Sequence, residues 1–390
     1  MAGRRGAAAQ PAHPAPVADD RPAIRPPRLP VLRTERPHLA GLPRPALRDR
    51  LDAMGIGPAY RADQIFSWLH AHGATTFEAM TSLPRALRAR LCAEALARGL
   101  EVTAVARSAD GTRKLLLRTL DGHAIETVLI PNEGRGYTQC VSSMVGCSLT
   151  CRFCATAALG FTRMLATWEI VDQVRRARAL LAAEPEGASS RITNVVFMGM
   201  GEPLHNFDAV RDAIEILTDE RGFGIAGRRI TVSTAGIVPL IERFVREGLA
   251  ERVGLAVSLN ATTQAARAHL MPVGRRYPLG DLLAVLGRVP TPKRRRITLE
   301  YVLLPGENDT PDDAGRLGDM ARRLGCQVNL IPFNPHPFAP YPRPAAHAVE
   351  TFAGAVRARG AAVYVRTPRG EDIAAACGQL AAGGEEGATP

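Results

Sequence analysis

One stretch dominates this sequence: Cys140-Val-Ser-Ser-Met-Val-Gly-Cys147-Ser-Leu-Thr-Cys151-Arg-Phe-Cys154. Its last three cysteines form a CxxxCxxC run that follows a short apolar segment typical of a strand. Three thiolates at this spacing suit three corners of an iron–sulfur cube, which needs four ligands when protein alone holds it. One iron then stays open, and an open metal position is where substrate chemistry takes place. The run therefore predicts a 4Fe-4S cluster on Cys147, Cys151 and Cys154.

The alternative for these cysteines is structural zinc. Structural zinc sites usually combine two paired CxxC-like half-sites into a tetrahedron. The sequence contains no second closely spaced pair of cysteines outside residues 140–154. The CxxxCxxC spacing is instead the signature of the radical S-adenosylmethionine (SAM) enzymes, whose SAM binds the open iron through its amino and carboxylate groups. The resemblance implies SAM as a second cofactor.

Composition limits the class of protein. A chain of 390 residues, 46% of them hydrophobic, can form a main domain with a sizeable core and a smaller domain. It contains neither an apolar run long enough to cross a bilayer nor a signal-peptide pattern. Seven cysteines, four of them within residues 140–154, suit a reducing compartment. We therefore expect a cytoplasmic, monomeric protein without a membrane partner.

The net charge of +11 favours a polyanionic partner such as nucleic acid. General enrichment in arginine and alanine would raise the charge equally well without any RNA. Aromatic residues make up only 5%, which argues against a base-stacking RRM sheet. The basic runs 293–296 and 275–276 are either phosphate contacts or solvated charged faces.

The chain divides into five segments. Residues 1–45 hold ten of the thirty prolines and no serine, which predicts a disordered tail; a transit peptide is the alternative. Residues 46–100 show helical spacing of apolar residues and predict a small helical RNA-binding domain. Residues 101–136 read as three short strands, a small β module. Residues 137–381 form the main domain, and residues 382–390 a second disordered tail.

Strands and helices alternate in the main domain, which predicts an α/β fold with a parallel sheet, either doubly wound or curled into a barrel. The predicted strands lie near 139–143, 192–198, 229–234, 253–259, 297–304, 328–331 and 363–366. Polar or cysteine-rich segments follow five of them: the cysteine loop, 199–202, 233–234, 258–260 and Asn334. Because parallel strands end at one rim, these segments should meet there and form a site.

Several motifs have both a functional and a structural interpretation. In Gly199-Met-Gly201-Glu202-Pro203 the glycines allow close backbone approach and the carboxylate suits an ammonium group, although a plain strand-to-loop turn has the same pattern. Glu126 lies in a strand, where an exposed carboxylate is the default expectation. Cys377 lies near the C-terminus, where inert packing is the usual role of a cysteine.

Beyond the cysteine run, the chain resembles the RlmN/Cfr family of radical SAM adenosine methyltransferases, and its RlmN branch most closely. The resemblance covers roughly residues 46–381. It rests on six segments, namely 125–131, 140–156, 198–203, 233–236, 330–335 and 376–380.

This resemblance implies a partial (β/α) barrel of the radical SAM type with a small N-terminal helical domain and a short β module. It also implies methylation of carbon 2 of an adenosine in 23S rRNA, and in certain tRNAs, with electrons from an external donor such as flavodoxin or ferredoxin. Cfr-type enzymes methylate carbon 8 instead, which is one alternative. A non-catalytic, zinc-stabilised RNA-binding protein is another.

The resemblance also assigns roles to residues. Cys377 would carry the methyl group, Cys140 would be its resolving partner and Glu126 the proton acceptor. SAM would be contacted by Gly201, Glu202, Ser233, Ser258, Leu259, Asn260 and Asn334. Asn260 stands where many family members have histidine, and the loop between Pro131 and Cys140 is about one residue longer than usual.

The chemistry of the family accounts for the two extra cysteines. An adenine ring carbon and the methyl group of SAM are both electrophilic, so direct transfer fails. A nucleophilic thiolate therefore takes the methyl group from one SAM, and a second SAM is cleaved to a radical that activates it. A second thiolate then attacks the first sulfur and releases the product.

Overall fold

The computed structural model describes residues 29–381 apart from 33, 133, 135, 185–190 and 292–296. Most of the predicted tail at 1–45, the tail at 382–390 and the basic run 293–296 lie outside the described residues. Ordered structure begins before residue 46, the predicted start of the helical domain. Leu39 and Ala40 are buried in a 3-10 turn, η1 (Leu39–Gly41), and the preceding His38 stacks its ring on that of Trp168, with ring centres 4.1 Å apart.

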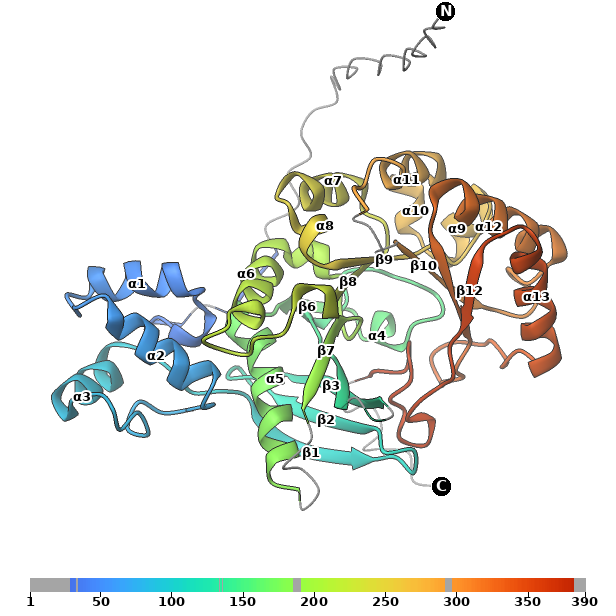
Figure 1. The fold of residues 1–390 in the computed structure, drawn as a ribbon. Helices are drawn as coiled ribbons and strands as arrows, with labels where there is room; N and C mark the ends of the chain where they lie inside the picture. The colour runs from blue at the N-terminus through green and yellow to red at the C-terminus, as the bar shows by residue number, and fades with distance from the viewer. Residues whose placement is uncertain are drawn as a thin grey trace, which may run out of the picture.

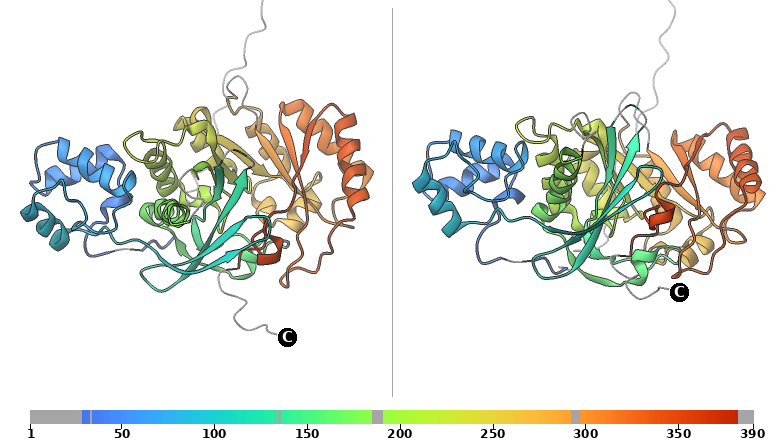
Figure 2. Two further views of the ribbon diagram at one scale, coloured as in Figure 1. Left: turned by 60° about the horizontal axis from the view of Figure 1, so that its bottom comes forward. Right: turned by 90° about the horizontal axis from the view of Figure 1, so that it is seen from below.

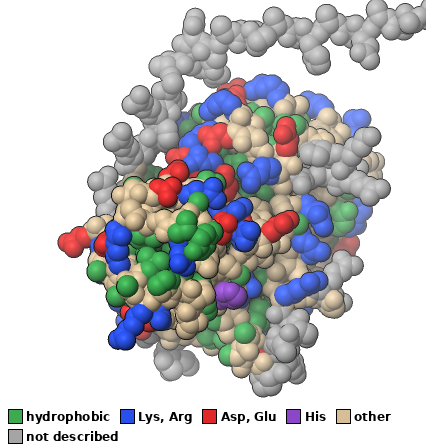
Figure 3. Space-filling view, turned by 60° about the vertical axis from the view of Figure 1, so that its left-hand side comes forward, with side chains coloured by type: hydrophobic (Ala, Val, Ile, Leu, Met, Phe, Trp, Pro, Cys, Tyr) green, Lys and Arg blue, Asp and Glu red, His purple; other side chains and the backbone are tan. Residues whose placement is uncertain are grey.

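The helical segment contains α1 (Arg44–Ala53), α2 (Tyr60–His70) and α3 (Arg85–Glu94). Leu47 and Leu51, four positions apart on one face of α1, are both buried in the hydrophobic core, as the helical periodicity predicts. Figure 3 shows Lys and Arg side chains at many points on the face that carries this segment, interspersed with acidic side chains rather than gathered in one patch.

Ten strands form one sheet in the order β1-β2-β3-β4-β7-β8-β9-β10-β11-β12 (Figure 1). β1 to β4 pair antiparallel, and every pair from β4 to β12 is parallel. The three strands predicted in 101–136 therefore extend the main sheet. The bounds are β1 (Glu101–Arg107), β2 (Arg113–Arg118), β3 (Ala124–Asn132), β4 (Gly136–Cys140), β7 (Ile192–Phe197), β8 (Ile230–Thr234), β9 (Gly254–Ser258), β10 (Thr298–Leu303), β11 (Gln327–Pro332) and β12 (Ala362–Val365).

The order of the parallel strands decides between the two predicted architectures. A doubly wound sheet reverses direction at a switch point, whereas here each parallel strand lies beside the next one along the chain. In the described chain β1 and β12 are not paired, so the barrel is open. Figures 1 and 2 show the connecting helices along the outer side of the curved sheet. The predicted partial barrel is confirmed.

The helices that follow the strands bury apolar stripes against the sheet. They are α5 (Thr167–Ala182), α6 (Phe207–Thr218), α7 (Val238–Arg246), α8 (Leu249–Arg252), α9 (Gln264–Leu270), α10 (Val273–Arg276), α11 (Leu279–Leu286), α12 (Pro311–Leu324) and α13 (Ala346–Ala358). Short 3-10 turns are η3 (Pro203–Asn206), η4 (Gly227–Arg229) and η5 (Glu371–Ile373). The described helices include none long and apolar enough to span a membrane.

A small hairpin, absent from the sequence prediction, closes the cysteine loop. β5 (Met144–Gly146) pairs antiparallel with β6 (Phe161–Met164), and α4 (Ala155–Ala158) lies between them in the chain. Gly146 has a positive φ of 73°, and a Cβ there would collide with the carbonyl oxygen of Gly160. Only glycine therefore allows the hairpin to close directly before Cys147.

Candidate active site at the carboxyl ends of the parallel strands

The cysteine loop is anchored by buried polar side chains. β4 ends at Cys140, earlier than predicted, because Ser142 leaves the sheet to bond with α5 and with the loop after β7. The Ser142 amide donates to Gln173 Oε1 at 2.8 Å, and its hydroxyl donates to the carbonyl of Glu126 at 2.6 Å and accepts the Met200 amide at 2.9 Å. One serine thus joins β3 to two rim loops, a role that the sequence analysis missed.

The three cysteines of the run are neighbours in space as well as in sequence. Burial, followed by the charges of the other two thiols, raises the pKa of Cys151 well above its usual range, and burial raises that of Cys147 to about 12. An apolar group that includes Phe153, Leu270 and Met271 packs around Cys151 and Cys154. Thiols this strongly coupled in an apolar shell are stabilised as thiolates only by a positive partner, such as iron.

This donor set fits the expected cluster. Three thiols lie along one loop, within an apolar shell of the kind that tunes iron–sulfur centres. Among the residues that the structure describes, no three His, Cys, Asp or Glu side chains close around a single ion. Cys147, Cys151 and Cys154 are the residues that would hold this cluster.

Gly201 and Glu202 lie beside the cysteines. Gly201 has a φ of 101°, and a Cβ there would meet the side chain of Met144, so this approach requires glycine. The Glu202 carboxylate accepts the amides of Leu204 at 3.0 Å and Ala235 at 2.7 Å. Burial raises the pKa of Glu202 to about 7. A buried carboxylate in this position is suited to pair with a ligand ammonium group.

The ends of β8 and β9 are joined by an arginine that the sequence analysis missed. Arg267 is fully buried and donates to the carbonyls of Ser258 at 2.9 Å, Leu259 at 2.5 Å and Ala235 at 2.6 Å. Arg267 lies three positions before the apolar Leu270, on the same face of α9, and this spacing could have indicated that Arg267 is buried. Arg267 therefore fixes the relative position of the two loops that carry predicted SAM contacts.

Asn260, Ser233 and Ser258, three of the predicted SAM contacts, lie at the carboxyl ends of β8 and β9. Asn260 is a non-glycine residue with a positive φ, 53°, which asparagine tolerates better than most residues. Its Oδ1 accepts the Val302 amide at 2.8 Å, so its side chain helps to hold β10. Ser233 precedes the last residue of β8, and the backbone of Ser258 pairs in register with Glu300 of β10.

Cys377 and Cys140 line one cavity of about 840 Å³. Cys377 is accessible from this cavity, whereas Cys140 is 8% exposed, and both are free thiols. Burial and then the neighbouring Cys377 raise the pKa of Cys140 to about 12. Burial also raises the pKa of Cys377, while Arg366, on the same wall, lowers it. The inert role expected of a C-terminal cysteine does not suit this position.

The C-terminal segment reaches the cavity through contacts distant in sequence. The Ala155 amide, next to Cys154, donates to the carbonyl of Gly378 at 2.8 Å. Asn334 is buried and donates to the carbonyl of Cys377 at 3.3 Å. These bonds place Cys377 between the cysteine loop and the loop after β11.

Glu126 is not the exposed strand carboxylate expected from the pattern. It is 3% exposed, pairs with Lys114 Nζ at 3.0 Å and accepts the Ala381 amide at 2.8 Å. The prediction that Glu126 is exposed was wrong because β3 is an inner strand of the sheet and is covered on both faces. Lys114, its partner on β2, had no signal in the sequence.

Glu300 is a second buried carboxyl near this cavity. It is 6% exposed on β10 and accepts the Asn329 amide group at 2.9 Å. Burial raises its pKa to about 7, against the lowering effects of Arg366 and Asn329. The folded protein thus holds this proton more tightly than the unfolded chain, so the stabilisation is complete below pH 4.5 and is lost as the pH rises to about 7.

We expect Glu300→Gln, which keeps the shape and the acceptor oxygen, to remove this pH dependence. Relative to wild type, the variant should gain about 3 kcal/mol in free energy of unfolding between pH 4.5 and 8. Denaturant unfolding at the two pH values measures the gain, with the exposed Glu350→Gln as the control. An equal difference at both pH values would contradict the expected proton uptake at Glu300.

Comparisons with known proteins agree with this geometry. The Radical SAM superfamily model matches residues 141–317, and the model of the ribosomal RNA large subunit methyltransferase N-terminal domain matches residues 38–96. A relative from Anaeromyxobacter dehalogenans, named dual-specificity RNA methyltransferase RlmN, is 47% identical over 92% of this chain and 95% of its own. This chain belongs to the RlmN family.

Further relatives support the assignment. The Parvibaculum lavamentivorans protein of the same name is 46% identical over 88% of this chain and 89% of its own. The crystal structure of a radical SAM methyltransferase from Sphaerobacter thermophilus matches with a TM-score of 0.83 and 45% identity, over 89% of this chain and 99% of that one. The protein is accordingly a radical SAM RNA methyltransferase, as the sequence predicted.

Proposed function

We propose that this RlmN-family enzyme methylates carbon 2 of a specific adenosine in 23S rRNA, and of an adenosine in certain tRNAs, by way of a methyl group on Cys377. One observation carries the proposal: Cys377 and Cys140 line the same cavity, although most of the chain separates them. The relatives named dual-specificity RNA methyltransferase support the two RNA classes.

In this proposal Cys147, Cys151 and Cys154 hold a 4Fe-4S cluster that, when bound, supplies the electron for SAM cleavage. Glu202 would pair with the ammonium group of SAM, and Arg267 holds the loops that follow β8 and β9, which would contact SAM. The remaining SAM contacts are Gly201, Ser233, Ser258, Leu259, Asn260 and Asn334.

Cys377 acts as the nucleophile toward the methyl group of the first SAM. Its thiol must lose a proton first, and Arg366 favours the thiolate through its charge. This transfer leaves S-adenosylhomocysteine. A 5′-deoxyadenosyl radical from a second SAM would then take one hydrogen atom from the methyl group and leave as 5′-deoxyadenosine. The carbon radical would add to carbon 2 of the adenine, and the adduct would lose one electron, which the bound cluster would accept. The base is then joined to the protein through the Cys377 sulfur.

Glu126 removes the ring proton in the next step. Its carboxylate is held in place by Lys114 Nζ at 3.0 Å and by the Ala381 amide at 2.8 Å, as a positioned proton acceptor must be. The Cys140 thiolate then attacks the Cys377 sulfur, so that an S–S bond forms and the bond from sulfur to the methylene carbon breaks. That carbon takes up a proton and leaves as the methyl group of the RNA. Reduction of the disulfide restores both thiols.

The protein should act as a cytoplasmic monomer and take electrons from an external donor such as flavodoxin or ferredoxin. The reactive thiols favour a reducing compartment. The helical segment, matched by the rRNA methyltransferase N-terminal domain model, would bind the RNA.

Product mapping tests the proposal. Purified enzyme with a reconstituted cluster is incubated anaerobically with SAM, a reductant and 23S rRNA or tRNA, and the nucleosides are identified by mass spectrometry after nuclease digestion. We expect 2-methyladenosine at one position. A product methylated only at carbon 8 would favour the Cfr-type alternative. Zinc without sulfide in the anaerobically purified protein would favour the non-catalytic one.

A further inference from the structure

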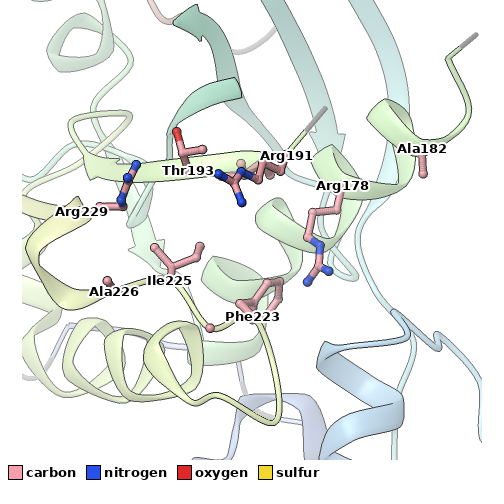
Figure 4. Close-up of a pocket in the computed structure, with 10 residues that line it drawn as sticks. Arg178, Ala182, Arg191, Thr193, Phe223, Ile225, Ala226 and Arg229 are labelled. Atoms are coloured by element: carbon pink, nitrogen blue, oxygen red, sulfur yellow. The ribbon is translucent and has the colours of Figure 1, made fainter. Parts of the chain in front are cut away.

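A second cavity, of about 600 Å³, lies at the opposite end of the sheet from the reaction site. It opens where β7 and β8 begin, beside the last turns of α5. Figure 4 shows Arg229, Arg191 and Arg178 in an arc around this opening, across from Phe223 and Ile225. The proposed reaction uses none of these residues.

The guanidinium groups come from α5 (Arg178), from η4 (Arg229) and from the residue before β7 (Arg191), and the partners of Arg178 and Arg229 among the described residues are neutral. Arg178 donates to the carbonyl of His70 at 3.2 Å and lies 5.2 Å from the centre of the Phe223 ring. Arg229 donates to Asn194 Oδ1 at 3.2 Å. Within the described ranges, neither these two nor Arg191 forms an ion pair with a carboxylate.

Other arginines of this chain show that carboxylate partners are the usual arrangement. Arg243 pairs with two acidic side chains, and Arg211 with three. Among the described residues these three positive charges have no carboxylate partner that would offset their mutual repulsion, and burial already lowers the pKa of Arg178. An anion in the cavity would remove that cost.

We propose that this cavity binds a phosphate group. Guanidinium groups present paired N–H donors that match phosphate oxygens, and three of them here surround a space large enough for one. Phe223 and Ile225 add an apolar wall against which a sugar or base would pack. Two sources share this chemistry: the backbone of the RNA substrate, and a free polyphosphate such as that of a nucleotide.

The surroundings favour RNA as the source, an inference that rests on the proposed function. The bond from Arg178 to His70 places the cavity against the end of α2, in the segment matched by the rRNA methyltransferase N-terminal domain model. The cavity therefore lies next to the segment that is proposed to bind the RNA. Figure 3 shows Lys and Arg side chains scattered among acidic ones on the face of the helical segment. The three arginines at the cavity, which have no carboxylate partner among the described residues, are therefore the stronger phosphate site.

The test uses full-length protein carrying Arg191→Gln and Arg229→Gln, since both side chains are exposed and their replacement should not unfold the chain. The matched control is Arg288→Gln with Arg322→Gln, which removes the same charge from exposed arginines that have carboxylate partners. Affinity for a 23S rRNA fragment is measured at several salt concentrations. Affinity falls as salt rises, with a slope of about −0.7 in log affinity against log salt for each phosphate contact. The loss of two contacts should therefore make this slope less steep by about 1.4.

The outcomes separate the sources. A less steep salt dependence of RNA affinity in the cavity variant, but not in the control, supports the RNA backbone as the source of the phosphate. Equal slopes, with pyrophosphate raising the melting temperature of wild type but not of the cavity variant, support a free polyphosphate. If neither the change in slope nor the rise in melting temperature is observed, the proposed phosphate site is refuted. Methylation at saturating RNA is assayed in parallel: loss of methylation in wild type would refute the proposed function, whereas the binding comparison tests the cavity alone.

Discussion

Cys377→Ala is expected to abolish methyl transfer to RNA while SAM cleavage continues. The variant lacks the only sulfur proposed to take the methyl group, whereas Cys147, Cys151 and Cys154 remain. Removing a covalent nucleophile can lower a rate by about 10⁶-fold. The yield of 2-methyladenosine and of 5′-deoxyadenosine, measured in the same reaction, shows whether the two activities separate.

The control is Cys92→Ala, a cysteine that contacts Glu78 in the helical segment. It should methylate RNA at the wild-type rate. The mass of the wild-type peptide that contains Cys377, after anaerobic incubation with SAM, should rise by one methyl group. Methylated RNA from the Cys377→Ala variant would show that another group carries the methyl.

Cys140→Ala is expected to trap the RNA on the protein. Cys140 lines the cavity beside Cys377, and no other cysteine lines it among the described residues. Without a thiolate to attack the Cys377 sulfur, the bond between that residue and the base should persist. The variant should accumulate about one covalently bound RNA per active protein, visible on a denaturing gel.

Two features distinguish this adduct from a disulfide or an aggregate. It should resist thiol reductants, because a thioether joins the Cys377 sulfur to the carbon on the base. It should also be absent when Cys377→Ala is combined with Cys140→Ala. Free methylated RNA released at the wild-type rate by Cys140→Ala would refute the resolving role of Cys140.

Local patterns were sufficient to predict a parallel sheet and the cluster loop, whereas the partial barrel was implied by the family resemblance. The alternation of strands and helices predicted the seven parallel strands, because apolar periodicity reports directly which residues face a core. The CxxxCxxC spacing predicted neighbouring thiols, because ligands a few residues apart on one loop stay close in any compact fold. Gly201 was found the same way, since close backbone approach requires glycine.

Other features could be found only in the tertiary structure. Glu126 was expected at the surface, yet it is buried beside Lys114, because the pattern of one strand does not show what covers its second face. The position of Cys377 next to Cys140 was implied by family resemblance, and no local rule gives it. It depends on the bonds of the C-terminal segment to Ala155 and Asn334.

The same distinction holds for the groups that the sequence analysis missed. Arg267 joins two rim loops, and Arg178, Arg191 and Arg229 surround the second cavity, although each looks like an ordinary surface arginine in the sequence. The sequence alone determined which residues of each helix and strand face the core, and which cluster ligands lie close together along the chain. The tertiary structure decided which distant groups meet, because such contacts depend on how whole elements pack and not on the spacing within any one of them.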